Sequence, residues 1–103
     1  MNTLTIEIGE ARAQTVIITE DELTISLDDG RSVSVPLAWY PRLYHAAPEE
    51  RQHWQLIGGG EGIHWPDLDE DIAVIHLLAG VPSGESQRSL AKWLKSRESQ
   101  KDD

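Results

Sequence analysis

Apolar and polar residues alternate along most of the first third of the chain. The alternation is clearest over residues 23–27 and 31–35, where every second side chain is apolar. A period of two is typical of strands with one buried face, and residues 3–8 fit the same pattern. Residues 15–19 predict a further strand because they are β-branched almost throughout. Gly30, between the last two strands, supplies the positive φ that a tight hairpin needs. The first third therefore predicts an antiparallel meander.

The spacing of apolar residues changes to a helical one after Pro36. Residues 37–45 carry apolar side chains three and four positions apart, which predicts a short helix. Pro41 is tolerated there only close to the start of the helix. Pro48 followed by two glutamates predicts a second short helix over residues 48–53, because proline and acidic residues favour a first turn.

The second half of the chain predicts short elements joined by turns. Residues 54–57 and 72–74 have the composition of strands, and residues 76–78 predict one turn of helix. The glycine-rich residues 58–62 predict a bulged connection between two strands, because glycine permits unusual backbone angles.

A final helix is expected to begin at Ser83 or Ser86, since serine is a favoured N-cap. Leu90, Trp93 and Leu94 form the apolar stripe of a helix packed on a sheet. We expect the polar residues 96–103 to form a frayed tail.

These elements predict one α+β domain over residues 1–95. It would consist of a small antiparallel or mixed β-sheet, containing the N-terminal meander, with two short central helices and a C-terminal helix. A length of 103 residues suits one domain, and there is no cysteine for a disulfide or a thiolate metal site. No leader pattern and no apolar run long enough to span a membrane is present, so we expect a cytoplasmic protein.

Charge is abundant and unevenly placed. The formal net charge is −9, which disfavours nucleic-acid binding as a main role because the phosphate backbone is repelled. No Lys or Arg occurs between Arg51 and Arg88, and that interval contains six acidic residues. The interval from Arg88 to Lys101 is basic instead. Such a distribution predicts either two solvated faces or an acidic surface that captures a basic partner.

Three local patterns resemble known sites but lack essential parts. Residues 58–62 lack the Lys-Ser/Thr pair of a phosphate loop and contain an acidic residue. Asp67, Asp69 and Asp71 have the spacing of a calcium loop, but its glycine and final glutamate are missing. The histidines match no zinc signature. Sequence therefore predicts no catalytic residue, no metal site and no cofactor, and we expect a protein that is not an enzyme.

Four blocks resemble one bacterial family, the domain of unknown function 2442 family. They are DGRSVSVPL at residues 29–37, WYPRL at 39–43, GEGIHWPDLDEDI at 60–72 and LLAG at 77–80. The resemblance implies a small α+β domain without established catalytic residues. It also implies an arrangement like a toxin–antitoxin pair, because members are often encoded beside a second small protein. Some members add a helix-turn-helix domain, for which the residues after Gly80 leave no room.

These observations favour a protein-interaction module, antitoxin-like, that docks an acidic surface on a small basic partner protein. Aromatic side chains beside the acids would be exposed and would anchor the partner. The predicted contact residues are Trp39, Glu61, His64, Trp65, Asp67, Asp69 and Asp71.

Two alternatives remain open. The first is a regulatory, DNA-associated protein that acts as a dimer through the basic last helix, with Arg88, Lys92 and Lys95 as contacts. The second, least favoured, is a hydrolase that pairs His64 with Asp67 or Asp69. A homodimer is compatible with either binding role, because small sheets with open edges often pair.

Overall fold

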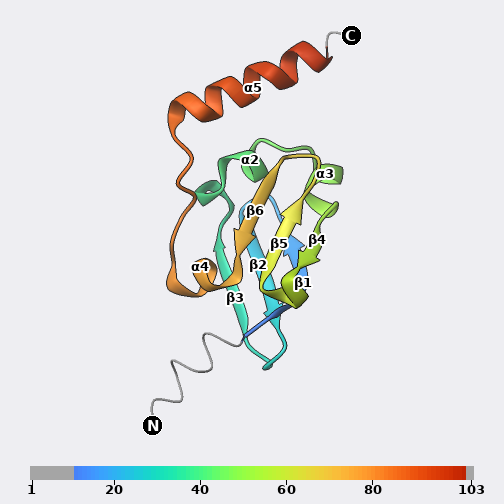
Figure 1. Ribbon diagram of the computed structural model, residues 1–103, viewed down its shortest axis with the longest axis vertical. Helices are drawn as coiled ribbons and strands as arrows, with labels where there is room; N and C mark the ends of the chain where they lie inside the picture. Colours follow the sequence, from blue (N-terminus) through green and yellow to red (C-terminus); the bar gives the residue numbers. More distant parts are fainter. Residues whose placement is uncertain (1–10, 102–103) are drawn as a thin grey trace.

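The structure is a computed structural model that describes residues 11–101. The strand expected over residues 3–8 lies outside the described residues. Within the described part the chain is an α+β fold, as the sequence predicts (Figure 1). It has two antiparallel sheets, several short helices and a longer C-terminal helix.

The first sheet is the meander expected from the alternating pattern. Its order is β1-β2-β3, and all neighbours are antiparallel. Gly30 adopts φ 93° in the turn between the last two strands, where a side chain would be strained. The strands are β1 (Ala13–Ile18), β2 (Glu22–Leu27) and β3 (Ser32–Pro36).

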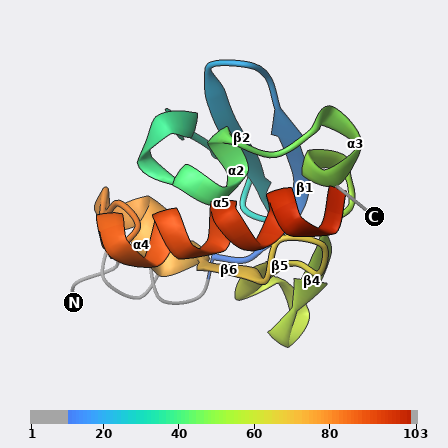
Figure 2. The same cartoon turned by 90° about the horizontal axis from the view of Figure 1, so that it is seen from above.

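The second half of the chain forms its own sheet and does not add strands to the first. Its order is β4-β5-β6, again antiparallel, so β6 is an edge strand. The strands are β4 (Gln55–Ile57), β5 (Gly62–Trp65) and β6 (Glu70–Ala73). The two sheets lie in separate layers (Figure 2), and the core between them is apolar. Both layers contribute fully buried side chains, among them Leu23, Ile25, Ile63 and Trp65.

The helix expected over residues 37–45 is interrupted. The 3₁₀ turn η1 (Leu37–Trp39) is separated from α2 (Pro41–Tyr44) by Tyr40. Pro41 explains the break, because it has no N–H to continue a helix and occupies the first position of the next one. The second expected helix is α3 (Pro48–Gln52), where Glu50 Oε1 accepts a hydrogen bond from the Ala47 N–H at 2.9 Å.

The last two helices frame an extended segment. Helix α4 (Val74–Ala79) ends at Gly80, which adopts the left-handed conformation with φ 72° and turns the chain into residues 81–86. Helix α5 (Gln87–Lys101) follows. Ser86 Oγ accepts from the Ser89 N–H at 3.0 Å, so Ser86 is the cap.

Helix α5 differs from the expected C-terminal helix in two ways. It includes residues 96–101, which were expected in the frayed tail, because Arg, Glu and Lys favour a helix even without burial. It also does not pack on a sheet. It crosses one end of the domain near α2 and α3 (Figures 1 and 2), and its expected stripe is only half-buried there. In the described part of the chain, no helix has the length and apolar character needed to cross a membrane.

Candidate functional site

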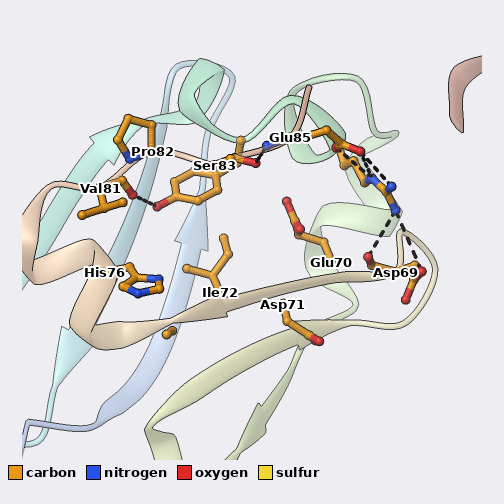
Figure 3. Close-up of a pocket in the computed structure, with 13 residues that line it drawn as sticks. Asp69, Glu70, Asp71, Ile72, His76, Val81, Pro82, Ser83 and Glu85 are labelled. Carbon is orange, nitrogen blue, oxygen red and sulfur yellow. Dashed lines mark hydrogen bonds and ion pairs between the residues drawn. The ribbon is translucent and has the colours of Figure 1, made fainter. Parts of the chain in front are cut away.

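A cleft of about 490 Å³ lies beside β6. One wall is β6 itself and the other is the extended segment after Gly80, with His76 of α4 at one end and Glu85 at the other (Figure 3). Arg42 of α2, which is bonded to Glu85, lines the cleft as well. The opening lies at the edge of the second sheet, so ligands can reach it from solvent.

Arg42 joins the two walls of the cleft. Its Nε donates to both carboxylate oxygens of Glu85 at 2.9 and 3.1 Å, and its Nη2 donates to Oε2 at 2.8 Å. Its Nη1 donates to the carbonyls of Leu68 and Asp69 at 3.1 and 3.2 Å. The hydrogen bonds between the two side chains raise the pKa of Arg42 and lower the pKa of Glu85. The guanidinium is therefore held by protein groups on both walls.

Glu70 points into the cleft from β6 (Figure 3). Burial raises its pKa from 4.5 to about 7, with Arg42 opposing the shift and the negative charge of Glu85 adding to it. Its Oε2 atom is buried and has no hydrogen-bond partner among the described residues. This oxygen is therefore both desolvated and unpaired, which is a costly arrangement in a folded protein.

Hydrogen bonds hold the outer wall of the cleft in place. The hydroxyl of Tyr40 donates to the carbonyl of Val81 at 3.0 Å, and the N–H of Ser83 donates to the carbonyl of Trp39 at 3.1 Å. Ser83 Oγ accepts from the Glu85 N–H at 3.1 Å. Burial raises the pKa of Tyr40, so its hydroxyl stays a donor. The segment is therefore fixed although it belongs to no regular element.

The acidic residues singled out by sequence are exposed, and each lies near a positive or titratable partner. Glu61 contacts Arg12 at 3.1 Å, and Asp69 Oδ2 lies 4.0 Å from Arg42 with 94% of its side chain exposed. Asp67 contacts His53 at 2.8 Å, and Asp71 is hydrogen-bonded to His64 across β5 and β6. Exposed pairs of this kind are weak and open readily to other cations.

A second, shallower cleft of about 290 Å³ lies on the other side of β6. It is lined by Glu61 and Ile57, and it shares Asp71, Ile72 and Ala73 with the first cleft. The two clefts therefore flank β6. Four carboxylates lie on or next to β6, and we call them the acidic edge: Glu61, Asp69, Glu70 and Asp71. The structure brings together three of the acidic residues predicted from sequence and adds Glu70, while Asp67 turns to His53.

The aromatic part of the predicted site needs correction. Trp65 is fully buried, and its indole Nε1 donates to the Arg51 carbonyl at 3.0 Å, so it cannot anchor a partner on this surface. Trp39 is half-buried against the core, and His64 is half-buried beside Asp71. The reason is strand parity: Trp65 lies two residues after the buried Ile63 on β5.

The basic residues predicted as nucleic-acid contacts lie on α5. Arg88, Lys92 and Lys95 are exposed, and their spacing of four and three residues places them along one face. Arg97 is different, because its guanidinium donates to Glu50 at 2.6 and 3.1 Å and lies over the Trp93 ring.

The glycine-rich residues and the aspartates take structural roles. Gly58–Gly60 form a 3₁₀ turn (η2) that connects β4 and β5, as expected. A Cβ on Gly60 would lie 2.7 Å from the Ala13 carbonyl, which explains the glycine. The three aspartates of the calcium-like spacing point to different partners. Over residues 11–101, no group of three or more His, Asp or Glu side chains is arranged to hold a metal ion.

Comparison with known proteins identifies the family. The family described as "Protein of unknown function (DUF2442)" matches residues 13–83, and the chain belongs to this family. No curated protein matches the sequence. A protein of unknown function from Rhodospirillum rubrum has a similar crystal structure, with a TM-score of 0.64 and 24% identity over 76% of this chain and 96% of that one. An uncharacterized protein from Chromobacterium violaceum, solved by NMR, has a TM-score of 0.64 and 21% identity over 86% and 82%. These likenesses concern the fold.

Proposed function

We propose that this member of the DUF2442 family is a non-enzymatic protein-interaction module, antitoxin-like, whose acidic edge docks on a small basic partner protein. Charge attraction would bring the partner to β6, and contacts in the two clefts would then hold it. Trp39, which is half-buried, would contribute packing at the rim and not a deeply inserted anchor.

The observation that supports this proposal is the continuity of the acidic edge. Asp71 lines both clefts, so carboxylates follow β6 from Glu61 at one end to Asp69 at the other. The surrounding sequence supplies no Lys or Arg between residues 51 and 88. Two arginines from elsewhere reach the edge, where Arg42 is engaged by Glu85 and Arg12 pairs with Glu61. The edge therefore carries excess negative charge on a surface that is concave on both sides.

The test is an affinity-capture experiment. The tagged protein is fixed on a column, lysate of its own host is passed over it at low salt, and bound proteins are eluted at high salt. A variant with Glu61→Gln, Asp69→Asn and Asp71→Asn removes three charges from the acidic edge. A matched control with Glu20→Gln, Asp21→Asn and Glu49→Gln removes three exposed charges elsewhere. We expect the wild type and the control to retain a small basic protein that high salt elutes, and the edge variant to lose it. Equal recovery on all three columns would refute the proposal.

A second candidate function is supported by the basic face of α5. Three cations, Arg88, Lys92 and Lys95, are exposed along it and could contact phosphates if two copies acted together. A gel-shift assay with a DNA duplex tests this role, because phosphate-driven binding must weaken steeply as salt rises. Glutamine at all three positions should abolish the shift. Retention of the shift in that variant would exclude this function.

A further inference from the structure

We infer that the cleft beside β6 receives an extended segment of the basic partner, which adds a strand to the free edge of the second sheet. The inference rests on the proposed function for the source of this segment. The addition of a strand follows from the backbone of β6 itself and can be tested with a synthetic peptide.

The first argument is the free edge of β6. Among the described residues, β6 has a neighbouring strand on one side only, which is β5. The N–H of Val74 donates to the carbonyl of Glu61 at 2.9 Å, and this bond fixes the alternation of the ladder. The even-numbered residues of β6 therefore bond to β5, whereas the backbone groups of Asp71 and Ala73 point away from it. Both residues line the cleft.

The second argument concerns which of these backbone groups are available. The N–H of Asp71 is hydrogen-bonded to the carboxylate of Glu70. Ala73 is the N-cap of α4, so its carbonyl accepts the first hydrogen bond of that helix. The carbonyl of Asp71 and the N–H of Ala73 remain. In a parallel ladder, one residue opposite Ile72 would donate to the first group and accept from the second, so the edge favours a strand that runs parallel to β6.

The third argument is the wall on the far side of the cleft. Residues 81–85 run alongside β6 in the opposite direction, on the way from α4 to α5 (Figure 1). Hydrogen bonds to Tyr40 and to the carbonyl of Trp39 hold this wall in place. The cleft volume of about 490 Å³ falls in the usual range for ligand sites. An added strand would thus lie between two fixed extended segments, with its affinity supplied by main-chain hydrogen bonds.

The side chains around the cleft indicate which peptide fits. Directly opposite residues of paired strands place their side chains on the same face. The residue opposite Ile72 would lie near Val81 and Pro82, which line the same cleft (Figure 3), so an aliphatic side chain suits it. The preceding residue would lie opposite Asp71, whose carboxylate is exposed, and Asp69 is exposed next to it. A lysine or arginine followed by an aliphatic residue therefore complements this edge.

The experiment is an NMR titration of the full chain with the peptide acetyl-Lys-Thr-Lys-Val-Thr-amide. We expect saturable shifts of the backbone amides of Asp71, Ala73 and Gly84. Methylation of the valine nitrogen removes the donor to the Asp71 carbonyl and should weaken binding about tenfold or more. Methylation of the first lysine nitrogen is the control, because that N–H would point away from β6. A peptide with norleucine at both lysines should also bind more weakly.

The matching change in the protein is Ala73→Pro, which removes the N–H of the free edge. Ala73 has φ −83°, which proline can adopt, and its N–H takes no part in the ladder with β5, so the fold should persist. We expect this variant to bind the peptide at least about tenfold more weakly, and Ala73→Ser, which keeps the N–H, to bind it like the wild type. No saturable shift with the wild type, or undiminished binding of the valine-methylated peptide, would overturn the inference.

The proposed function fails separately. If Ala73→Pro still captures the basic partner while the edge variant does not, the docking surface stands and strand addition is wrong. If the wild type captures no partner but binds the peptide, and Ala73→Pro does not bind it, strand addition stands and the proposed function is wrong.

Discussion

Glu70 is a residue whose neighbours work against its charge. Burial and the carboxylate of Glu85 favour the protonated form, and the guanidinium of Arg42 offsets only part of this effect. Since the side chain is only partly buried, full ionisation is expected to cost the folded state about 1–2 kcal/mol. A domain of this size is stable by only about 5–15 kcal/mol, so keeping such a carboxyl has a measurable cost.

The stability of the protein should therefore depend on pH through Glu70. The folded state holds this proton more tightly than the unfolded chain does. The resulting stability is fully present below pH 4.5 and is lost as the pH rises through about 7. We expect Glu70→Gln to match the wild type at pH 5 and to exceed it by about 1–2 kcal/mol at pH 8. Urea unfolding at several pH values measures this.

Glu49→Gln is the control for that experiment, because Glu49 is exposed on α3. Its unfolding free energy should follow the wild type at every pH. A Glu70→Gln curve parallel to the wild type from pH 5 to 8 would mean that Glu70 titrates normally in the folded protein.

Strand parity accounts for the burial of Trp65, which was expected to be exposed, and for the direction of Glu70, which was not predicted as a site residue. Ile63 and Trp65 alternate with His64 on β5, and Glu70 shares a face of β6 with the buried Ile72. The register pairs Trp65 directly with Glu70. Sequence alone conceals this, because Glu70 lies within a run of acids that is typical of a solvated loop, and nothing marks where β6 begins.

Trp65 should contribute to stability and not to partner binding. Replacing it with phenylalanine leaves the Arg51 carbonyl without its donor and opens a small cavity in the core. We expect Trp65→Phe to lower the free energy of unfolding by about 1–3 kcal/mol. Trp54→Phe, at a half-buried position, should cost less. Unfolding followed by circular dichroism measures both, and an undisturbed Trp65→Phe would contradict the buried placement.

At the level of elements, α5 is attached to the domain by few contacts. It lies outside residues 13–83, which match the family. It contacts the rest of the chain through Trp93, whose ring lies by Arg42, and through Arg97, which donates to Glu50. The Trp93 ring lies between two guanidinium groups, Arg42 at 5.2 Å and Arg97 at 4.6 Å from its centroid. Arg42 also lines the cleft, so the helix and the candidate site share one residue.

Loss of the Trp93 ring should release α5 while the sheets stay folded. The cation–π contact between the ring and Arg42 contributes about 0.5–2 kcal/mol, and the ring also packs against the edge of the core. We expect Trp93→Ala to increase amide hydrogen exchange over residues 87–98 by about tenfold, with the strands unchanged. Lys92→Ala, on the exposed face, is the control. Unchanged exchange in Trp93→Ala would mean that other contacts hold the helix.

The elements themselves were predictable to differing degrees. Local alternation sufficed for β2 and β3, and β-branched composition for β1. Their pairing followed because hairpin turns pair consecutive strands. The same reasoning could not assign β4, β5 and β6 to a second sheet, because periodicity reports which faces are buried and not which strands pair. The packing partner of α5 was misjudged for the same reason. An apolar stripe at Leu90, Trp93 and Leu94 predicts that this face is buried, but it does not identify the element that covers it.

For the whole molecule, the placement of charge matters more than its total. The net charge of −9 arises from a chain whose acidic edge and basic α5 face lie in different regions. Net charge alone would slow the approach of any anion and hasten that of any cation. An acidic edge should in addition orient the incoming partner toward β6, because the field is strongest near clustered charges.

Orientation by the acidic edge can be separated from net charge by association kinetics. The edge variant and its control both lose three negative charges, so their net charges are equal. We expect the association rate constant for the captured basic partner to fall by about tenfold in the edge variant and by much less in the control. The rate for the wild type should decrease steeply with ionic strength, whereas the edge variant should depend on it only weakly. Stopped-flow fluorescence at several salt concentrations measures these slopes. Identical slopes for the two variants would mean that total charge, and not the acidic edge, governs the encounter.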